Sequence, residues 1–206
     1  MRSAMRDGAR WLAVGVAVCS TAFSATLAAQ DGPTRRSPAL GGYFGILSEV
    51  GRFDGQTVKA AEEESGHFGL FVGRWSVGYV EKLLTRSVVV FTPGSDPRVT
   101  SLRLSGLEVG RLIRRVGPAQ LAAYTVVGRA RVSAAVGAAT TSTSTVVLEP
   151  AISVGIAIGP VLRVDARAGA RLGGTASIAG ERFGTSGPFA GVRWSLGWLG
   201  DWRMRR

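Results

Sequence analysis

The chain has 206 residues, with 25 Lys and Arg against 14 Asp and Glu, 29 glycines and a single cysteine. This length suits one domain of ordinary size. Beyond the N-terminal segment, no apolar run approaches the roughly 20 residues that a membrane-spanning helix needs, so a helical membrane protein is excluded.

Residues 1–29 have the order of a secretory signal peptide. Three arginines (Arg2, Arg6 and Arg10) precede a short apolar run over 11–18, and small residues follow up to Ala29. The run is too short to span a bilayer, which disfavours the alternative of an N-terminal membrane anchor. Cleavage would remove Cys19, leaving no disulfide and no thiolate metal site, and would lower the net charge from +11 to +9. We therefore expect an exported chain.

The mature part begins with a polar segment, 30–40, that we expect to be a flexible leader. After it, apolar and polar residues alternate with a period of two, which is typical of strands with two different faces. A change of phase at Gly106 suggests a β-bulge. The predicted strands are 42–50, 67–79, 83–91, 101–113, 122–138, 152–159, 161–172 and 190–198.

The connections between these strands alternate in length. Long polar loops are expected at 52–66, 92–97, 140–145 and 173–187, and tight turns near 80–82, 117–118 and 159–160. Long loops at one end and short turns at the other are typical of outer-membrane barrels. The best strands also continue for about nine to eleven residues, which matches a tilted transmembrane strand. The sequence thus predicts an all-β fold, an up-and-down antiparallel transmembrane β-barrel of about eight strands over 41–199, with a basic tail at 200–206.

Charged side chains occupy one face of several predicted strands. An arginine facing lipid at the bilayer midplane would cost about 2–4 kcal/mol, so we expect these side chains to point into the lumen. The arginine fork suits paired carboxylates, so a salt-bridge network that fills the lumen is favoured over an anion path or gate. The predicted network consists of Glu49, Glu108, Arg129, Arg131, Arg163, Asp165, Arg167, Arg171 and Arg193.

The last predicted strand places Gly191, Trp194, Leu196 and Trp198 in an alternating pattern. With it, the chain resembles the small eight-stranded outer-membrane β-barrel proteins, the superfamily that includes the OmpA-type transmembrane domain. The resemblance covers about residues 41–199. It implies a location in the outer membrane of a Gram-negative cell, contact with outer-membrane lipid and lipopolysaccharide, and a C-terminal signal in these four residues for the barrel-assembly machinery.

No catalytic constellation stands out, and we expect no enzyme, cofactor, metal or nucleic-acid partner. The leading hypothesis is a structural or loop-displaying barrel that is porin-like in fold. One alternative is a lipid-modifying enzyme at the extracellular rim with His67 as general base, although a solvated loop histidine is the favoured interpretation of His67. Another alternative is a soluble periplasmic β-barrel that binds a small apolar ligand.

Overall fold

The computed structural model describes residues 40–53, 56–60, 65–86, 98–136, 138–159 and 161–198. The predicted signal peptide, the leader up to residue 39, the loop at 92–97 and the basic tail lie outside these residues. Within the described ranges, no helix is long and apolar enough to cross a membrane.

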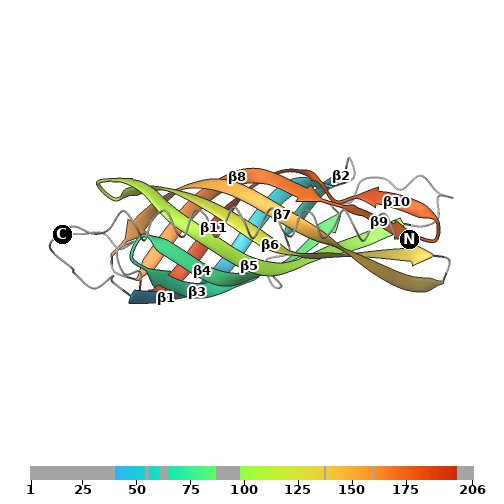
Figure 1. Cartoon of the computed structure of the whole chain (residues 1–206), viewed down its shortest axis with the longest axis horizontal. Coiled ribbons are helices and arrows are strands. Elements are labelled where there is room, and N and C mark those ends of the chain that lie inside the picture. Colours follow the sequence, from blue (N-terminus) through green and yellow to red (C-terminus); the bar gives the residue numbers. More distant parts are fainter. Residues whose placement is uncertain are drawn as a thin grey trace, which may run out of the picture.

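The described part of the chain is built from antiparallel strands that close into a ring (Figure 1). β11 pairs with both β8 and β1, which closes the sheet. β2 and β3 both lie between β1 and β4 and share one position, so the ring has eight positions, as predicted. The strands are β1 (Leu40–Phe53), β2 (Gln56–Ala60), β3 (Gly66–Val72), β4 (Trp75–Arg86), β5 (Arg98–Val116), β6 (Ala119–Val136), β7 (Ala139–Ile158), β8 (Leu162–Gly173), β9 (Thr175–Ile178), β10 (Glu181–Gly184) and β11 (Gly187–Trp198).

Tight turns lie at the end of the barrel where β1 begins and β11 ends, called here the turn end (Figure 1). Gly73, Gly117 and Gly159 each begin a turn there with a positive φ, a conformation that glycine adopts without steric cost. The turns at 117–118 and 159–160 were predicted, but the turn predicted near 80–82 is wrong. The chain reverses at Gly73 instead, and Val80 and Lys82 lie within β4.

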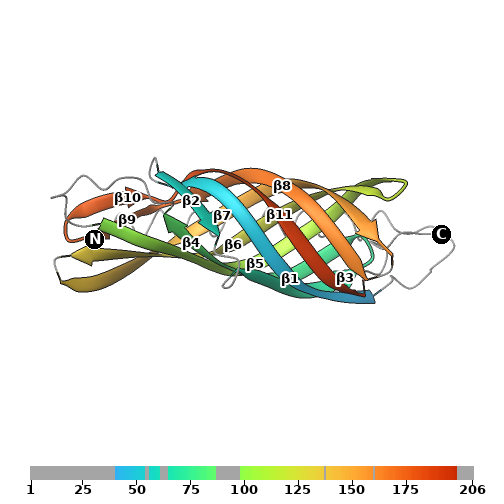
Figure 2. The same ribbon diagram turned by 180° about the vertical axis from the view of Figure 1, so that it is seen from behind.

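The opposite end, called the loop end, is extended by three long strands. β5, β6 and β7 span 19, 18 and 20 residues, and the β6–β7 and β9–β10 hairpins project beyond the other strands (Figure 2). The predicted Thr/Ser loop at 140–145 is therefore wrong, because these residues pair with β6. Their β-branched threonines favour extended backbone. The predicted loop at 173–187 contains a hairpin of β9 and β10.

The outer wall carries a band of exposed apolar side chains, called here the apolar belt, with large members at every ring position except that of β6. Phe44, Ile152, Val154 and Trp194, for example, are all about half exposed or more. The belt runs around the ring, with members on β1, β3, β4, β5, β7, β8 and β11. Its large members are Phe44, Ile46, Val50, Phe68, Leu70, Val77, Leu107, Ile152, Val154, Ile156, Ile158, Leu172, Val192, Trp194, Leu196 and Trp198.

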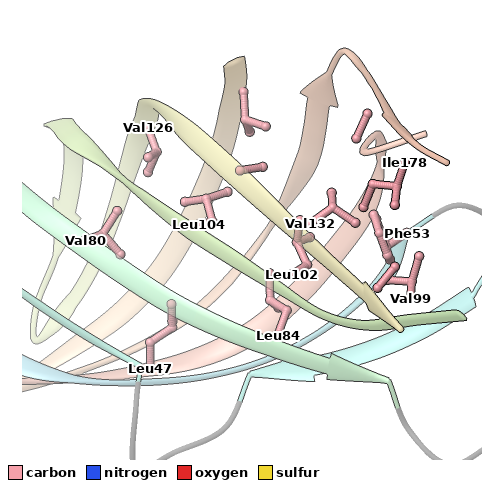
Figure 3. Close-up of a cluster of buried hydrophobic side chains, with 14 residues drawn as sticks. Leu47, Phe53, Val80, Leu84, Val99, Leu102, Leu104, Val126, Val132 and Ile178 are labelled. Atoms are coloured by element: carbon pink, nitrogen blue, oxygen red, sulfur yellow. The ribbon is translucent and has the colours of Figure 1, made fainter. Parts of the chain in front are cut away.

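At the loop end, apolar side chains lie inside the barrel. At the belt, by contrast, the large apolar side chains lie on the outer wall. Leu102 and Leu104 on β5 are fully buried in this upper core (Figure 3), whereas Leu107 on the same strand is 62 % exposed on the belt. The strand register runs unbroken through Gly106, so the bulge predicted there is wrong. The change of phase in the sequence marks the boundary between the upper core and the belt. The register shifts of β5 lie between Val99 and Ser101 and between Leu112 and Arg114.

Candidate functional site: the charged lumen

Buried charged side chains also line the barrel interior, beginning within the upper core, where Lys82 lies between Val80 and Leu84 on β4. The period of two along β1, β4, β5, β7, β8 and β11 points every second residue inward. Burying a charge without a partner is costly, so each of these groups needs an opposite charge or hydrogen bonds. They fall into two groups.

The first group is a closed ring of four residues, called here the four-residue ring. Lys82 Nζ lies 2.8 Å from Glu49 Oε2 and 2.6 Å from Glu149 Oε2. Arg171 completes the ring, with Nη2 3.0 Å from Glu49 Oε1 and Nε 2.6 Å from Glu149 Oε1. All four side chains are 0 % exposed, and their formal charges sum to zero. The ring ties β1, β4, β7 and β8 together across the lumen.

The second group, called here the arginine cluster, lies around Glu108 and Asp165. Arg193 Nη1 and Arg167 Nη1 lie 2.6 Å and 3.2 Å from the two Glu108 oxygens. Arg163 pairs with Asp165, and Arg193 Nε lies 3.6 Å from Asp165 Oδ2. Three arginines against two carboxylates leave the cluster with a formal charge of +1.

Aromatic rings supply further partners for these arginines. The Arg193 guanidinium lies 4.1 Å from the centre of the Tyr124 ring, and that of Arg167 lies 5.4 Å from the centre of the Phe189 ring. Such stacking is attractive for a desolvated cation. Lys82 Nζ also lies 4.8 Å from the Phe189 ring, so this one aromatic side chain contacts both charged groups.

His67 lies inside the barrel on β3 and is only 4 % exposed. Its Nε2 lies within hydrogen-bond distance, 2.9 Å, of Ser195 Oγ on β11. Gly45 on β1 pairs with both residues and stands between them, and a side chain there would collide with the His67 ring and the Trp194 carbonyl. The predicted solvated position of His67 is therefore wrong, because β3 starts at Gly66 and the period of two turns residue 67 inward.

A histidine beside a serine is half of a nucleophilic constellation, so its surroundings matter. In the described part of the chain, His67 Nδ1 has no hydrogen-bond partner, so no carboxylate orients the ring in the manner of a catalytic triad. The pair is also enclosed by the wall and lies away from the rim. The geometry therefore suits a structural hydrogen bond.

The structure brings seven of the nine predicted network residues together in the lumen and leaves two outside. Arg129 and Arg131 on β6 are exposed on the outer wall, so their predicted inward orientation is wrong. The prediction assumed that every arginine on a strand lies at the depth of the lipid. These two lie at the loop end, where the upper core holds the apolar face of β6 inside and the polar face outside.

Two members of the network were missed. Glu149 lies four residues before Ser153 on β7, so both side chains point inward. It was missed because the Thr/Ser run and Pro150 suggested a loop in place of the first half of this long strand. Lys82 shares the phase of Ser76 and Val80 and was assigned to a turn. Extending the period of two across these segments would have found both residues.

The predicted assembly-signal residues lie on β11. Trp194, Leu196 and Trp198 are exposed on the outer wall, and Gly191 lies against β1, where a side chain would collide with the Ser48 carbonyl. Their recognition by the assembly machinery stays a prediction. Elsewhere in the described ranges, no group of three His, Cys, Asp or Glu residues is placed to hold a metal ion.

Comparison with known proteins supports the fold. The structure is similar to the crystal structure of Neisserial surface protein A (NspA), with a TM-score of 0.54 and 9 % sequence identity over 80 % of this chain and 99 % of that chain. It also matches Ail, the attachment invasion locus protein of Yersinia pestis, with a TM-score of 0.44 and 11 % identity over 78 % and 99 % of the two chains. The sequence matches no protein-family model, and no curated protein is detectably similar to it. The likeness to NspA confirms the small outer-membrane type of β-barrel fold that the resemblance implied.

Proposed function

We propose that the protein is an integral β-barrel of the outer membrane that acts as a structural scaffold and displays its loop end outside the cell. The observation that carries this proposal is the apolar belt. Soluble proteins rarely expose a contiguous apolar patch larger than a few hundred Å², whereas a barrel in lipid needs an apolar outer face. The closed ring also gives the wall strands hydrogen-bond partners on both sides, as lipid demands.

The filled lumen supports a scaffold over a channel. The four-residue ring crosses the interior, the arginine cluster lies near it, and the upper core occupies the loop end. An eight-stranded barrel is only just wide enough for its own side chains. We therefore expect planar-bilayer recordings of the purified protein to show no steady conductance, and a steady large conductance would contradict the scaffold proposal.

Fractionation of cells that express the full chain tests the location. We expect the protein in the outer-membrane fraction after a carbonate wash, with gel migration that changes on heating because the folded barrel resists detergent. Recovery of the folded protein from the aqueous periplasmic fraction would favour the soluble alternative. His67 does not favour the enzyme alternative, because it is 4 % exposed and its Nδ1 has no hydrogen-bond partner among the described residues.

A further inference from the structure

Three arginines lie together on the outer wall of β5 and β6. Arg103 and Arg131 are directly opposite each other in the strand register, and Arg129 lies two residues before Arg131 on the same face. All three side chains are exposed. Glu81 on β4 pairs with Arg103, with 2.7 Å between Oε1 and Nε. Among the described residues, neither Arg129 nor Arg131 takes part in a recorded ion pair, so this outer arginine group keeps a formal charge of +2.

The pairing of Arg103 with Arg131 is unfavourable by itself. Directly opposite residues of an antiparallel pair have Cβ atoms about 4.5–5.5 Å apart, and like charges at that distance destabilise the sheet. One carboxylate cannot neutralise three guanidinium groups. An anion bound between the arginines would offset their repulsion.

The group borders the apolar belt. One step closer to the turn end on the same outer face, Tyr79, Leu107, Val127 and Leu148 form a row of register partners across β4, β5, β6 and β7. Leu107 is 62 % exposed, so this row belongs to the surface that faces acyl chains in the proposed orientation. The arginines therefore lie where the head groups of the outer leaflet begin.

We propose that Arg103, Arg129 and Arg131 bind a phosphate group of lipopolysaccharide in the outer leaflet. Guanidinium forks bind phosphate oxygens through two parallel hydrogen bonds, which suits a doubly charged phosphomonoester. Ser105 and Ser144, the register partners of Arg129 and Arg131, add hydroxyl donors on the same face. The neighbouring apolar row favours a phosphate that is attached to acyl chains over a free ion. This inference rests on the outer-membrane location proposed above. It adds the class of lipid that binds to the outer wall at these arginines.

The test compares lipid binding by two matched double variants of the full mature protein in detergent micelles. Arg129→Gln with Arg131→Gln removes two charges from the proposed site. Arg111→Gln with Arg114→Gln removes two exposed charges of β5 near the turn end, so both variants have the same net charge. The probes are lipid A with two phosphates, the same lipid A after enzymatic dephosphorylation, and inorganic phosphate, and the dissociation constant of each is measured.

We expect the loop-end variant to bind phosphorylated lipid A roughly 30-fold more weakly than the unchanged protein, because each basic residue near an anionic surface contributes about 1 kcal/mol. The turn-end variant should keep its affinity. Dephosphorylated lipid A should bind all three proteins equally weakly, and inorganic phosphate at the same concentration should not displace lipid A.

Equal affinities for phosphorylated lipid A in all three proteins, or equal losses in both variants, would overturn the site. Displacement by inorganic phosphate would overturn the lipid as its source. Heat-modifiable migration is measured in each sample. A protein that migrates as a folded barrel but fails to discriminate contradicts only this inference, whereas recovery of the protein from the aqueous fraction of cells contradicts the scaffold proposal itself.

Discussion

Lys82 and Arg171 neutralise Glu49 and Glu149 in the lumen. Among the described ion pairs, each of the two cations pairs with both carboxylates. A buried ion pair contributes little net stability when compared with apolar residues of the same shape. Removal of one member is different, because it leaves the remaining charges buried without compensation. The four-residue ring should therefore respond strongly to a single substitution.

We expect Lys82→Met to lower the free energy of unfolding by about 3–5 kcal/mol, since two carboxylates would then share Arg171 alone. Urea titration in phospholipid vesicles, followed by tryptophan fluorescence, measures this change. Arg129→Gln is the control, because an exposed side chain without a recorded partner should change stability by less than about 0.5 kcal/mol. A similar small effect of both substitutions would show that the ring does not stabilise the barrel.

Gly45 allows three strands to bring His67 and Ser195 together. A Cβ at this position would meet the Trp194 carbonyl and the His67 ring. We expect Gly45→Ala to cost about 1–3 kcal/mol, the usual range for overpacking, because β1 must shift away from β11. Gly42→Ala on the same strand is the matched control, since its Cβ would meet only ordinary contacts at 3.7 Å. The same urea titration compares the two variants, and equal stabilities would refute the close approach at Gly45.

At the scale of elements, the sequence predicts best those strands whose outer face is apolar and whose inner face is charged along most of their length. In β8 and β11 the apolar residues face outward and the charged residues inward, and the period of two alone identifies both faces. β5 was harder, because its apolar residues lie on the outer face at the belt (Leu107) and on the inner face in the upper core (Leu102 and Leu104). β6 was also harder, because its inner face is apolar along its whole length, from Ala122 to Ala134. No local pattern states which side of a strand is water and which is lipid, so Arg129 and Arg131 were assigned to the lumen.

The β9–β10 hairpin closes the loop end through its apolar side chains. Ala176 and Ile178 of β9 are buried in the upper core, where Figure 3 labels Ile178, whereas Ser177 between them is exposed. We expect Ile178→Asp to expel the hairpin from the core, because an unpaired carboxylate is costly to bury. Limited proteolysis of intact cells should then cut this hairpin faster, while heat-modifiable migration persists. Ser177→Asp should leave the cleavage rate unchanged, and equal rates in both variants would mean that the hairpin is not anchored by Ile178.

At the scale of the whole molecule, the apolar belt and the loop end place the residues of β7 at different depths relative to the proposed membrane. Val154 lies on the outer face in the middle of the belt, and Ser142 lies on the same face near the loop end. We expect Val154→Arg to cost about 2–4 kcal/mol and Ser142→Arg about 0–1 kcal/mol, because the cost of an arginine on the lipid face falls with distance from the midplane. Unfolding in vesicles measures both substitutions. Equal costs would place β7 in a uniform medium and contradict membrane insertion.

The length of β7 determines how far the barrel wall extends beyond the apolar belt. Twenty residues at about 3.3 Å each, tilted by roughly 40°, rise about 50 Å, whereas the apolar band of such barrels is about 25 Å tall. The upper core reaches only as far as Ala134 on β6 and Val147 on β7, because residues 139–146 have no buried side chain. The threonine-rich part of β7 is held by its pairing with β6 alone, and any partner that binds it does so clear of the bilayer surface.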